Sequence, residues 1–196
     1  MRRATPAIFA ILLLTVGSFA QSPGDKFWNE LKKLCGKAYA GAIVADTSPS
    51  PDFTGKAVVM HVRSCGADRI RIPFFVGENR SRTWVLTKNG NRIELKHDHR
   101  HEDGTPDKVT MYGGTTTNPG EPTRQFFPAD EETTRVVAPP VGRAPSPAAN
   151  IWWIELVPGE HYSYNLRRLG GDRLFTVKFD LTKEVTAPAA PWGWKD

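Results

Sequence analysis

The segment "WVLTKNGNRIELKHDHRHEDG", Trp84 to Gly104, gives the clearest indication of the fold. Apolar and polar residues alternate on both sides of Asn89-Gly90, and a period of two is typical of strands that bury one face. Asn-Gly is the favoured two-residue loop of a β-hairpin, because both residues tolerate positive φ. The segment therefore predicts two antiparallel strands joined at Asn89-Gly90.

A hairpin with this loop also fixes which residues face one another. The expected cross-strand pairs are Lys88 with Asn91, Leu86 with Ile93, and Trp84 with Leu95. The four apolar members of these pairs mark the buried face. Because residues two apart share a face of a strand, the same face continues into the three alternate histidines that follow.

The buried face of this hairpin becomes polar and basic toward its open end, and there we place the candidate ligand site. Its members are Glu78, Arg80, Arg82, Trp84, His97, His99 and His101. The expected register sets Arg82, Arg80 and Glu78 opposite the three histidines in turn. A guanidinium presents a fork of donors to a carboxylate or phosphate, and a histidine beside it adds another donor. Neighbouring cations should depress the histidine pKa values. The cluster favours a ligand with an acidic head and an apolar body.

The histidines leave two other interpretations open. Imidazoles on alternate strand positions can bind zinc, but three of them span about 13 Å at about 3.3 Å per residue, too far for one ion without a bulge. The facing arginines would also repel a dication. The metal alternative is a mononuclear site of His99 and His101 with Glu78 or Asp107. In the second interpretation, the basic cluster is a structural polar network at a barrel rim.

The sequence carries no catalytic motif that we recognise. It has no G-x-S-x-G, no H-E-x-x-H, no phosphate-binding loop and no dinucleotide fingerprint. A histidine–carboxylate pair for acid–base chemistry, His99 or His101 with Asp103 or Asp107, is the remaining enzymatic alternative. We expect no cofactor.

The first twenty residues have the features of a secretory signal peptide. Arg2 and Arg3 precede the apolar run Ala7–Val16, and small residues at positions 18 and 20 provide an A-x-A-like cleavage site. The apolar run is too short for a comfortable membrane span. We therefore expect an exported protein, periplasmic or secreted, that begins at Gln21.

Residues 21–196 are long enough for a single domain with a real core. The formal net charge of the whole chain is +5 and its basic residues are spread along the sequence, so a nucleic-acid partner is not expected. In an oxidising compartment, Cys35 and Cys65 are expected to form a disulfide. The expected partner is a small ligand, and the expected state is a monomer or weak dimer.

One helix and a series of eight or nine strands are expected in this domain. Ser22-Pro23-Gly24-Asp25 offers a helix cap, and Gly36 ends the apolar periodicity that follows. The expected strands are Lys37–Asp46, Lys56–Ser64, Arg69–Val76, Asn79–Lys88, Asn91–His101, Lys108–Thr116, Asn150–Leu156, His161–Arg168 and Leu174–Leu181. Residues 117–149 are Pro-rich and are expected to form one long loop. Sequential strands on short turns suggest an up-and-down antiparallel barrel, since closure removes exposed edges.

Two of these strands are rich in aromatic residues, and we expect their apolar faces to line the core of the barrel. The residues concerned are Trp152, Ile154 and Leu156 on one strand and Tyr162, Tyr164 and Leu166 on the next.

The order of these elements resembles the lipocalin-like (calycin) barrels. The first helix runs into "GKAYAG", Gly36 to Gly41, and those families place a glycine and an aromatic residue on the first strand. The usual tryptophan is Tyr39 here and lies one residue further from the glycine. The resemblance implies a cavity for a small ligand, with Arg167 or Arg168 as the closing arginine. The chain is also similar to a group of small bacterial exported proteins, which implies no activity.

The sequence thus predicts an all-β, up-and-down antiparallel barrel with a short N-terminal helix. The expected function is the binding of an amphipathic or anionic small ligand in the barrel cavity. One alternative is a hydrolase-like enzyme that uses a histidine–carboxylate or mononuclear metal site. Another is a structural or inhibitory envelope protein that binds another protein through the long loop.

Overall fold

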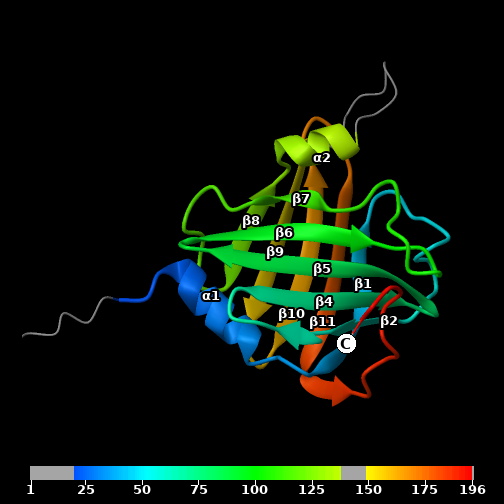
Figure 1. Cartoon of the computed structure of the whole chain (residues 1–196), viewed down its shortest axis with the longest axis horizontal. Helices are drawn as coiled ribbons and strands as arrows, with labels where there is room; N and C mark the ends of the chain where they lie inside the picture. The colour runs from blue at the N-terminus through cyan, green and yellow to red at the C-terminus, as the bar shows by residue number, and fades with distance from the viewer. Residues whose placement is uncertain (1–19, 138–148, 196) are drawn as a thin grey trace, which may run out of the picture.

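The computed structural model describes residues 20–137 and 149–195 (Figure 1). Among these residues an antiparallel sheet curls into a nearly closed ten-strand barrel, which confirms the predicted all-β class and architecture. The strands are β1 (Ala38–Asp46), β2 (Val58–His61), β3 (Ser64–Cys65), β4 (Arg69–Val76), β5 (Asn79–Asn89), β6 (Arg92–His99), β7 (Tyr112–Thr115), β8 (Arg124–Pro128), β9 (Asn150–Val157), β10 (His161–Arg168) and β11 (Leu174–Val185). The short β3 pairs only with β4 and lies off the barrel path.

The barrel is an up-and-down meander that closes through its first and last strands. The sheet order is β7-β6-β5-β4-β2-β1-β11-β10-β9-β8, so β1 pairs with β11 and most other neighbours follow one another in the chain. Inward side chains of these strands form one apolar core, and the alternation on β9 sets Trp152, Ile154 and Leu156 inside as predicted. Burial of this face fixes the register of each strand.

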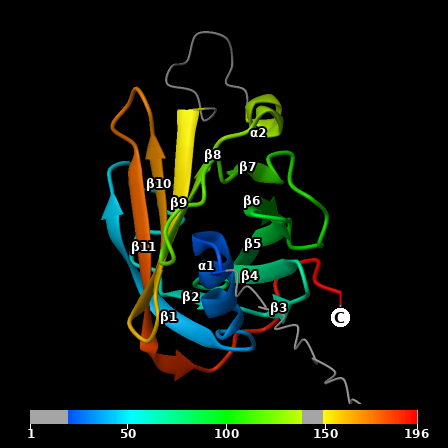
Figure 2. The same ribbon diagram turned by 90° about the vertical axis from the view of Figure 1, so that its left-hand side faces the viewer.

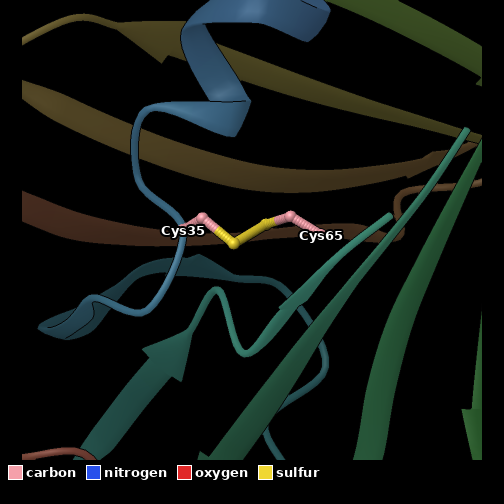
Figure 3. The surroundings of a disulfide bond; sticks show 2 residues. All are labelled: Cys35 and Cys65. Atoms are coloured by element: carbon pink, nitrogen blue, oxygen red, sulfur yellow. A yellow bond between two sulfur atoms is a disulfide. The ribbon is translucent and has the colours of Figure 1, made fainter. Parts of the chain in front are cut away.

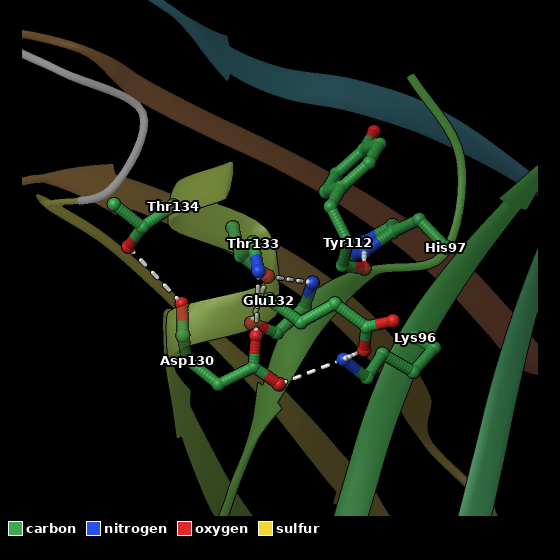
Figure 4. Close-up of polar contacts among 8 residues, drawn as sticks. Lys96, His97, Tyr112, Asp130, Glu132, Thr133 and Thr134 are labelled. Carbon is green, nitrogen blue, oxygen red and sulfur yellow. Dashed lines mark hydrogen bonds and ion pairs between the residues drawn. The ribbon is translucent and has the colours of Figure 1, made fainter. Parts of the chain in front are cut away.

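The junction between β7 and β8 is the one place on this path where no ladder of hydrogen bonds joins neighbouring described strands. The short helix α2 (Glu131–Val136) bridges it (Figure 4). The Thr133 hydroxyl accepts a hydrogen bond from the Gly113 N–H at 2.6 Å and donates to the Gly113 carbonyl at 2.7 Å. The Asp130 N–H donates to the same carbonyl at 3.0 Å. The backbones approach so closely that a Cβ on Gly114 would lie 1.8 Å from the Pro128 carbonyl oxygen.

Lys96 on the outer face of β6 is covered by the same helix. Its Nζ lies 2.7 Å from Asp130 Oδ2 and 2.6 Å from Glu132 Oε2, and only 5% of the residue is exposed (Figure 4). These hydrogen bonds raise the pKa of Lys96 despite the opposing effect of burial, which is the largest single influence. The ion pairs hold α2 against the wall of the barrel.

Helix α1 (Pro23–Lys32) begins at the predicted cap and closes one end of the barrel (Figure 2). The Ser22 side chain accepts the Asp25 N–H at 3.1 Å, and the Asp25 carboxylate accepts the Ser22 N–H at 3.3 Å, which completes a capping box. Its buried face, with Phe27 and Leu31, joins the core. Asp25 also pairs with Lys88 of β5 at 2.8 Å, so α1 lies beside the end of the β5–β6 hairpin.

The predicted disulfide between Cys35 and Cys65 is present (Figure 3). Cys35 follows α1 and Cys65 lies on β3, and their Cα atoms are 6.2 Å apart. The bond ties the end of the helix to the sheet across 30 residues of chain.

The prediction of one long loop over residues 117–149 is corrected by β8 and α2, while residues 138–148 lie outside the described part of the chain. β8 pairs with β9 along its length and buries Gln125 and Phe127 on alternate positions. β8 is only five residues long and is bounded by proline-rich sequence, so its alternation is too short to be recognised, and its pairing partner comes later in the chain.

The predicted signal peptide falls almost wholly outside the described residues, which begin at residue 20.

The predicted register of the β5–β6 hairpin is wrong by two residues. The observed pairs are Asn89 with Arg92, Lys88 with Ile93, Leu86 with Leu95, Trp84 with His97, and Arg82 with His99. The loop is therefore Gly90-Asn91, and Gly90 has a φ of 57°. This arrangement sets glycine at the first central position, as in a type II′ loop. Because the shift is even, every side chain keeps its predicted face.

Of the helices in the described ranges, none has the length and apolar character needed to cross a membrane.

Candidate ligand cavity

The barrel contains a cavity of about 220 Å³ toward the end where the β1–β2 segment and the β10–β11 hairpin meet. Six of its lining residues are aromatic: Phe53, Phe74, Trp84, Tyr112, Tyr164 and Phe175. Its lining also contains two guanidinium and two imidazole side chains, those of Arg82, Arg173, His97 and His99. The cavity is therefore a mainly aromatic pocket with a few polar groups, as small-molecule sites usually are.

A continuous series of nearly parallel rings crosses the barrel interior and lines the cavity. Trp84 lies 4.5 Å from Tyr164 and 4.9 Å from Phe74 between ring centroids, with interplanar angles of 18° and 11°. Phe53 continues the series at 6.3 Å from Phe74. These rings come from β4, β5, β10 and the segment between β1 and β2, so only the closed barrel brings them together.

His97 lies at the deep side of the cavity, and its partners settle its tautomer. Its Nδ1 lies 2.9 Å from the Tyr112 carbonyl oxygen, which can only accept, so Nδ1 carries the proton (Figure 4). Its Nε2 lies 2.7 Å from the Tyr164 hydroxyl. Burial lowers the pKa of His97 to about 3, so the ring is neutral and Nε2 accepts the proton of Tyr164. The deep polar pair is uncharged.

His99, one step nearer the rim, lies opposite Arg82 in the β5–β6 ladder. Its Nε2 lies 3.2 Å from the Tyr112 hydroxyl. Burial first, and then the charge of Arg82, lower the pKa of His99 to about 4. Burial likewise raises the pKa of Tyr112 to about 12. Both groups are neutral hydrogen-bonding partners at physiological pH.

The two arginines of the cavity differ in their partners. Arg173 forms an ion pair with Asp46. Arg82 is partly buried and donates from Nη1 to Asn79 Oδ1 at 3.1 Å and to Ser81 Oγ at 3.3 Å, both neutral oxygens. Its guanidinium carbon lies 5.0 Å above the Phe53 ring. Among the residues that the structure describes, no carboxylate forms an ion pair with Arg82. Burial lowers the pKa of Arg82, although it stays a cation.

The structure brings together four of the seven predicted site residues: Arg82, Trp84, His97 and His99 all line the cavity. The expected pairing partners differ, because Trp84 rather than Arg82 lies opposite His97.

Three predicted members lie outside the cavity. Arg80 lies beyond the last pair of the β5–β6 ladder, Arg82 with His99, and donates from Nη1 to the Ala190 carbonyl of the C-terminal segment at 3.1 Å. His101 is exposed in a turn in which the Gly104 N–H donates to its carbonyl at 2.9 Å. Glu78 is exposed in the turn between β4 and β5. Alternation fails to predict these positions because the strands end or leave the barrel wall.

The residues of the metal and acid–base alternatives are not assembled into such sites. Within the described ranges, no group of three or more His, Cys, Asp or Glu is placed to hold a metal ion. The predicted set of His99, His101 and Asp107 is therefore not such a group. The carboxylates of Asp103 and Asp107 accept hydrogen bonds from Thr105 and from the Val109 N–H instead of from an imidazole.

Several cavity residues were not singled out as site residues from the sequence. Tyr164 was expected only as barrel lining, and Tyr112 only as part of a strand. Phe53 and Arg173 lie in connecting segments, where no periodicity indicates the direction of a side chain. The turn residues Gly170-Gly171 between β10 and β11 are the one local signal that could have placed Arg173 at a barrel end.

The arginines that the barrel resemblance implies lie away from this cavity: Arg167 is exposed, and Arg168 donates from Nε to Asn150 Oδ1 at 2.9 Å. Comparison of the chain with protein-family models, with curated proteins and with solved structures finds no match. The residues of the cavity are therefore the basis for inferring what this protein binds.

Proposed function

We propose that this protein binds a small amphipathic or anionic ligand inside the barrel, with the acidic head of the ligand at Arg82 and His99. The observation that carries the proposal is the guanidinium of Arg82, partly buried at the cavity and bonded only to neutral oxygens among the described residues. A cation withdrawn from water without a counter-ion is costly, and a bound anion would offset this cost.

The geometry around Arg82 supports a head site rather than a structural ion pair. Arg173 has its carboxylate partner in Asp46, whereas Arg82 keeps donors beyond those used toward Asn79 and Ser81. His99 lies directly across the ladder and adds a neutral ring. A guanidinium fork with a neighbouring neutral donor suits a carboxylate or a similar oxyanion.

The rest of the cavity supports an apolar body for the ligand. Trp84 and Phe74 are almost fully buried behind Arg82, and Phe175 is buried on the other wall. A ligand entering past Arg82 would exchange water for aromatic surface, which is favourable at about 25 cal/mol per Å² of apolar area.

Export to the periplasm or the cell exterior belongs to the same proposal. Its supports are the signal-like N-terminal pattern and the disulfide, which persists in oxidising compartments. A nearly closed antiparallel barrel is also compatible with a lipocalin-like fold, whose members hold ligands in this way.

Native mass spectrometry of the purified protein tests the proposal. Wild type should carry a small molecule, and Arg82→Gln should lose it. Arg80→Gln is the matched control, since Arg80 lies two residues along the same strand and contacts the Ala190 carbonyl outside the cavity. Equal retention by both variants would contradict the proposal. Unfolding of Arg82→Gln by circular dichroism would favour a structural network, and stoichiometric zinc in the same sample would favour the metal alternative.

A further inference from the structure

We infer that the ligand is a planar aromatic monocarboxylate, small enough that a single ring or fused ring pair fills the cavity. This inference rests on the proposed function and specifies its ligand class. Three independent properties of the cavity lead to it: the number of uncompensated charges, the chemistry of the walls and the volume.

The charge count favours a monoanion. Of the two arginines at the cavity, Arg173 is neutralised by Asp46, which leaves Arg82 as the cation without a carboxylate partner in the described chain. His97 and His99 are neutral and cannot balance a second negative charge. Among the described acids, Asp52 stabilises the charge of Arg82 without forming an ion pair with it, so it offsets part of that charge and leaves even less to balance a second negative charge on the ligand. A dianion such as a phosphate monoester would keep one charge buried and uncompensated.

The wall chemistry favours a flat π-system over an aliphatic chain. Six of the lining residues are aromatic, and Leu166 is the only aliphatic side chain in the described lining. Phe74, Trp84 and Tyr164 stack on one another, with centroids 4.9 Å and 4.5 Å apart, so a bound ring would meet the edges of this series. Aromatic pairs gain about 0.5–1.5 kcal/mol beyond their buried area when rings stack or meet edge to face. A saturated ring of the same size would gain the area but not this additional interaction.

The volume sets the size of the ligand. A cavity of about 220 Å³ lies below the range of about 300–1,000 Å³ that holds drug-sized molecules. The volume corresponds to about seven water molecules at about 30 Å³ each. A long fatty acid or a tetrapyrrole would not fit within these walls, whereas a benzoate or an indole carboxylate would.

Isothermal titration calorimetry at pH 7.5 with four probes tests the class. Benzoate should bind about tenfold or more tightly than each of three matched compounds, on the scale of one stacking or charge interaction. Benzamide removes the charge, cyclohexanecarboxylate removes the planarity, and phenyl phosphate adds a second charge. Arg82→Gln should weaken benzoate binding by about tenfold, and Arg80→Gln should leave it within about twofold.

The possible failures are distinguishable. If cyclohexanecarboxylate or phenyl phosphate binds as tightly as benzoate, or if benzoate does not bind, the aromatic monocarboxylate class is wrong. When an Arg82-dependent molecule nevertheless copurifies with wild type, the proposed function survives that failure. Should nothing copurify and none of the four probes bind, both the class and the proposed function are overturned.

Discussion

The hydroxyl of Tyr164 donates a hydrogen bond to Nε2 of His97 over 2.7 Å, across the interior of the barrel. The two residues lie on β10 and β6, which are not neighbours in the sheet. The bond therefore connects two opposite walls at the deep side of the cavity. It also fixes His97 as a neutral acceptor, because Nδ1 donates to the Tyr112 carbonyl.

Loss of this bond should destabilise the fold. In Tyr164→Phe, Nε2 of His97 remains buried without a donor, and the free energy of unfolding should fall by about 1–3 kcal/mol. Tyr162→Phe is the matched control, because the Tyr162 hydroxyl is buried on the same strand and has no hydrogen-bond partner among the described residues. Its removal should be neutral or stabilising. Urea denaturation measures both, and equal losses would contradict the assignment.

Stability should fall as the pH is lowered from about 6.5 toward 4. Burial lowers the pKa values of His97 and His99 from 6.5 to about 3 and about 4, so in this range the unfolded chain binds protons that the folded protein does not. Each histidine should contribute about 1.4 kcal/mol per pH unit within that window. The contribution is fully present above pH 6.5.

His97→Gln should reduce the slope of the free energy of unfolding against pH by about 1.4 kcal/mol per pH unit, which is the contribution of one proton. This expectation holds whatever the variant does to absolute stability. His101→Gln is the control on the same segment, since the His101 side chain is exposed in a turn. Urea denaturation at several pH values gives the slopes. An unchanged slope in His97→Gln would contradict the buried neutral state of this ring.

The junction between β7 and β8 should depend on one hydroxyl. Thr133→Val keeps the shape of the side chain but leaves the Gly113 N–H without its partner, which should cost about 1–3 kcal/mol. Thr134→Val, one residue on, removes an exposed hydroxyl that donates only to the Asp130 carbonyl at 3.2 Å, and should have little effect. Hydrogen exchange of the Gly113 amide should accelerate in the first variant alone. Equal exchange in both would show that α2 does not close the junction.

Removal of the disulfide should lower the free energy of unfolding by about 3–4 kcal/mol, the loop-closure value for a loop of about this length. The bond spans 30 residues and joins α1 to β3. The double variant Cys35→Ser with Cys65→Ser should match the wild type after reduction with dithiothreitol, and dithiothreitol should not alter the variant further. A loss below about 1 kcal/mol would mean that the packing of α1 alone fixes this corner.

Much of the fold could be predicted because its signals are local. The capping box at Ser22 lies within four residues, and the bounds of Arg69–Val76 and His161–Arg168 are set by alternation and adjacent turn residues. The predicted hairpin register is wrong, because both Asn89-Gly90 and Gly90-Asn91 are able to form two-residue loops. The observed loop is Gly90-Asn91, in which Gly90 has a positive φ.

The candidate site was predictable only where it lies on regular strand. The shift by two residues preserved the inward face, so Arg82, Trp84, His97 and His99 reached the cavity in spite of the register error. Beyond the rim of the barrel, the alternation of residues along a strand no longer predicts which side chains face the interior. Arg80 accordingly donates to the Ala190 carbonyl instead of lining the cavity. Helix α2 was not predicted, because the contacts that stabilise it are made with β6 and β7, more than fifteen residues earlier in the chain.

The sequence by itself determined the period of the strands, the cap of the first helix, the pairing of its two cysteines and which face of β5 and β6 is buried. These properties follow from neighbours along the chain. Only the tertiary structure decided which charges meet. Closure of the barrel gave Arg173 its partner Asp46, 127 residues away, and left Arg82 beside neutral oxygens and aromatic rings. Whether a cation is compensated depends on distances through space, and these are fixed only when the walls close.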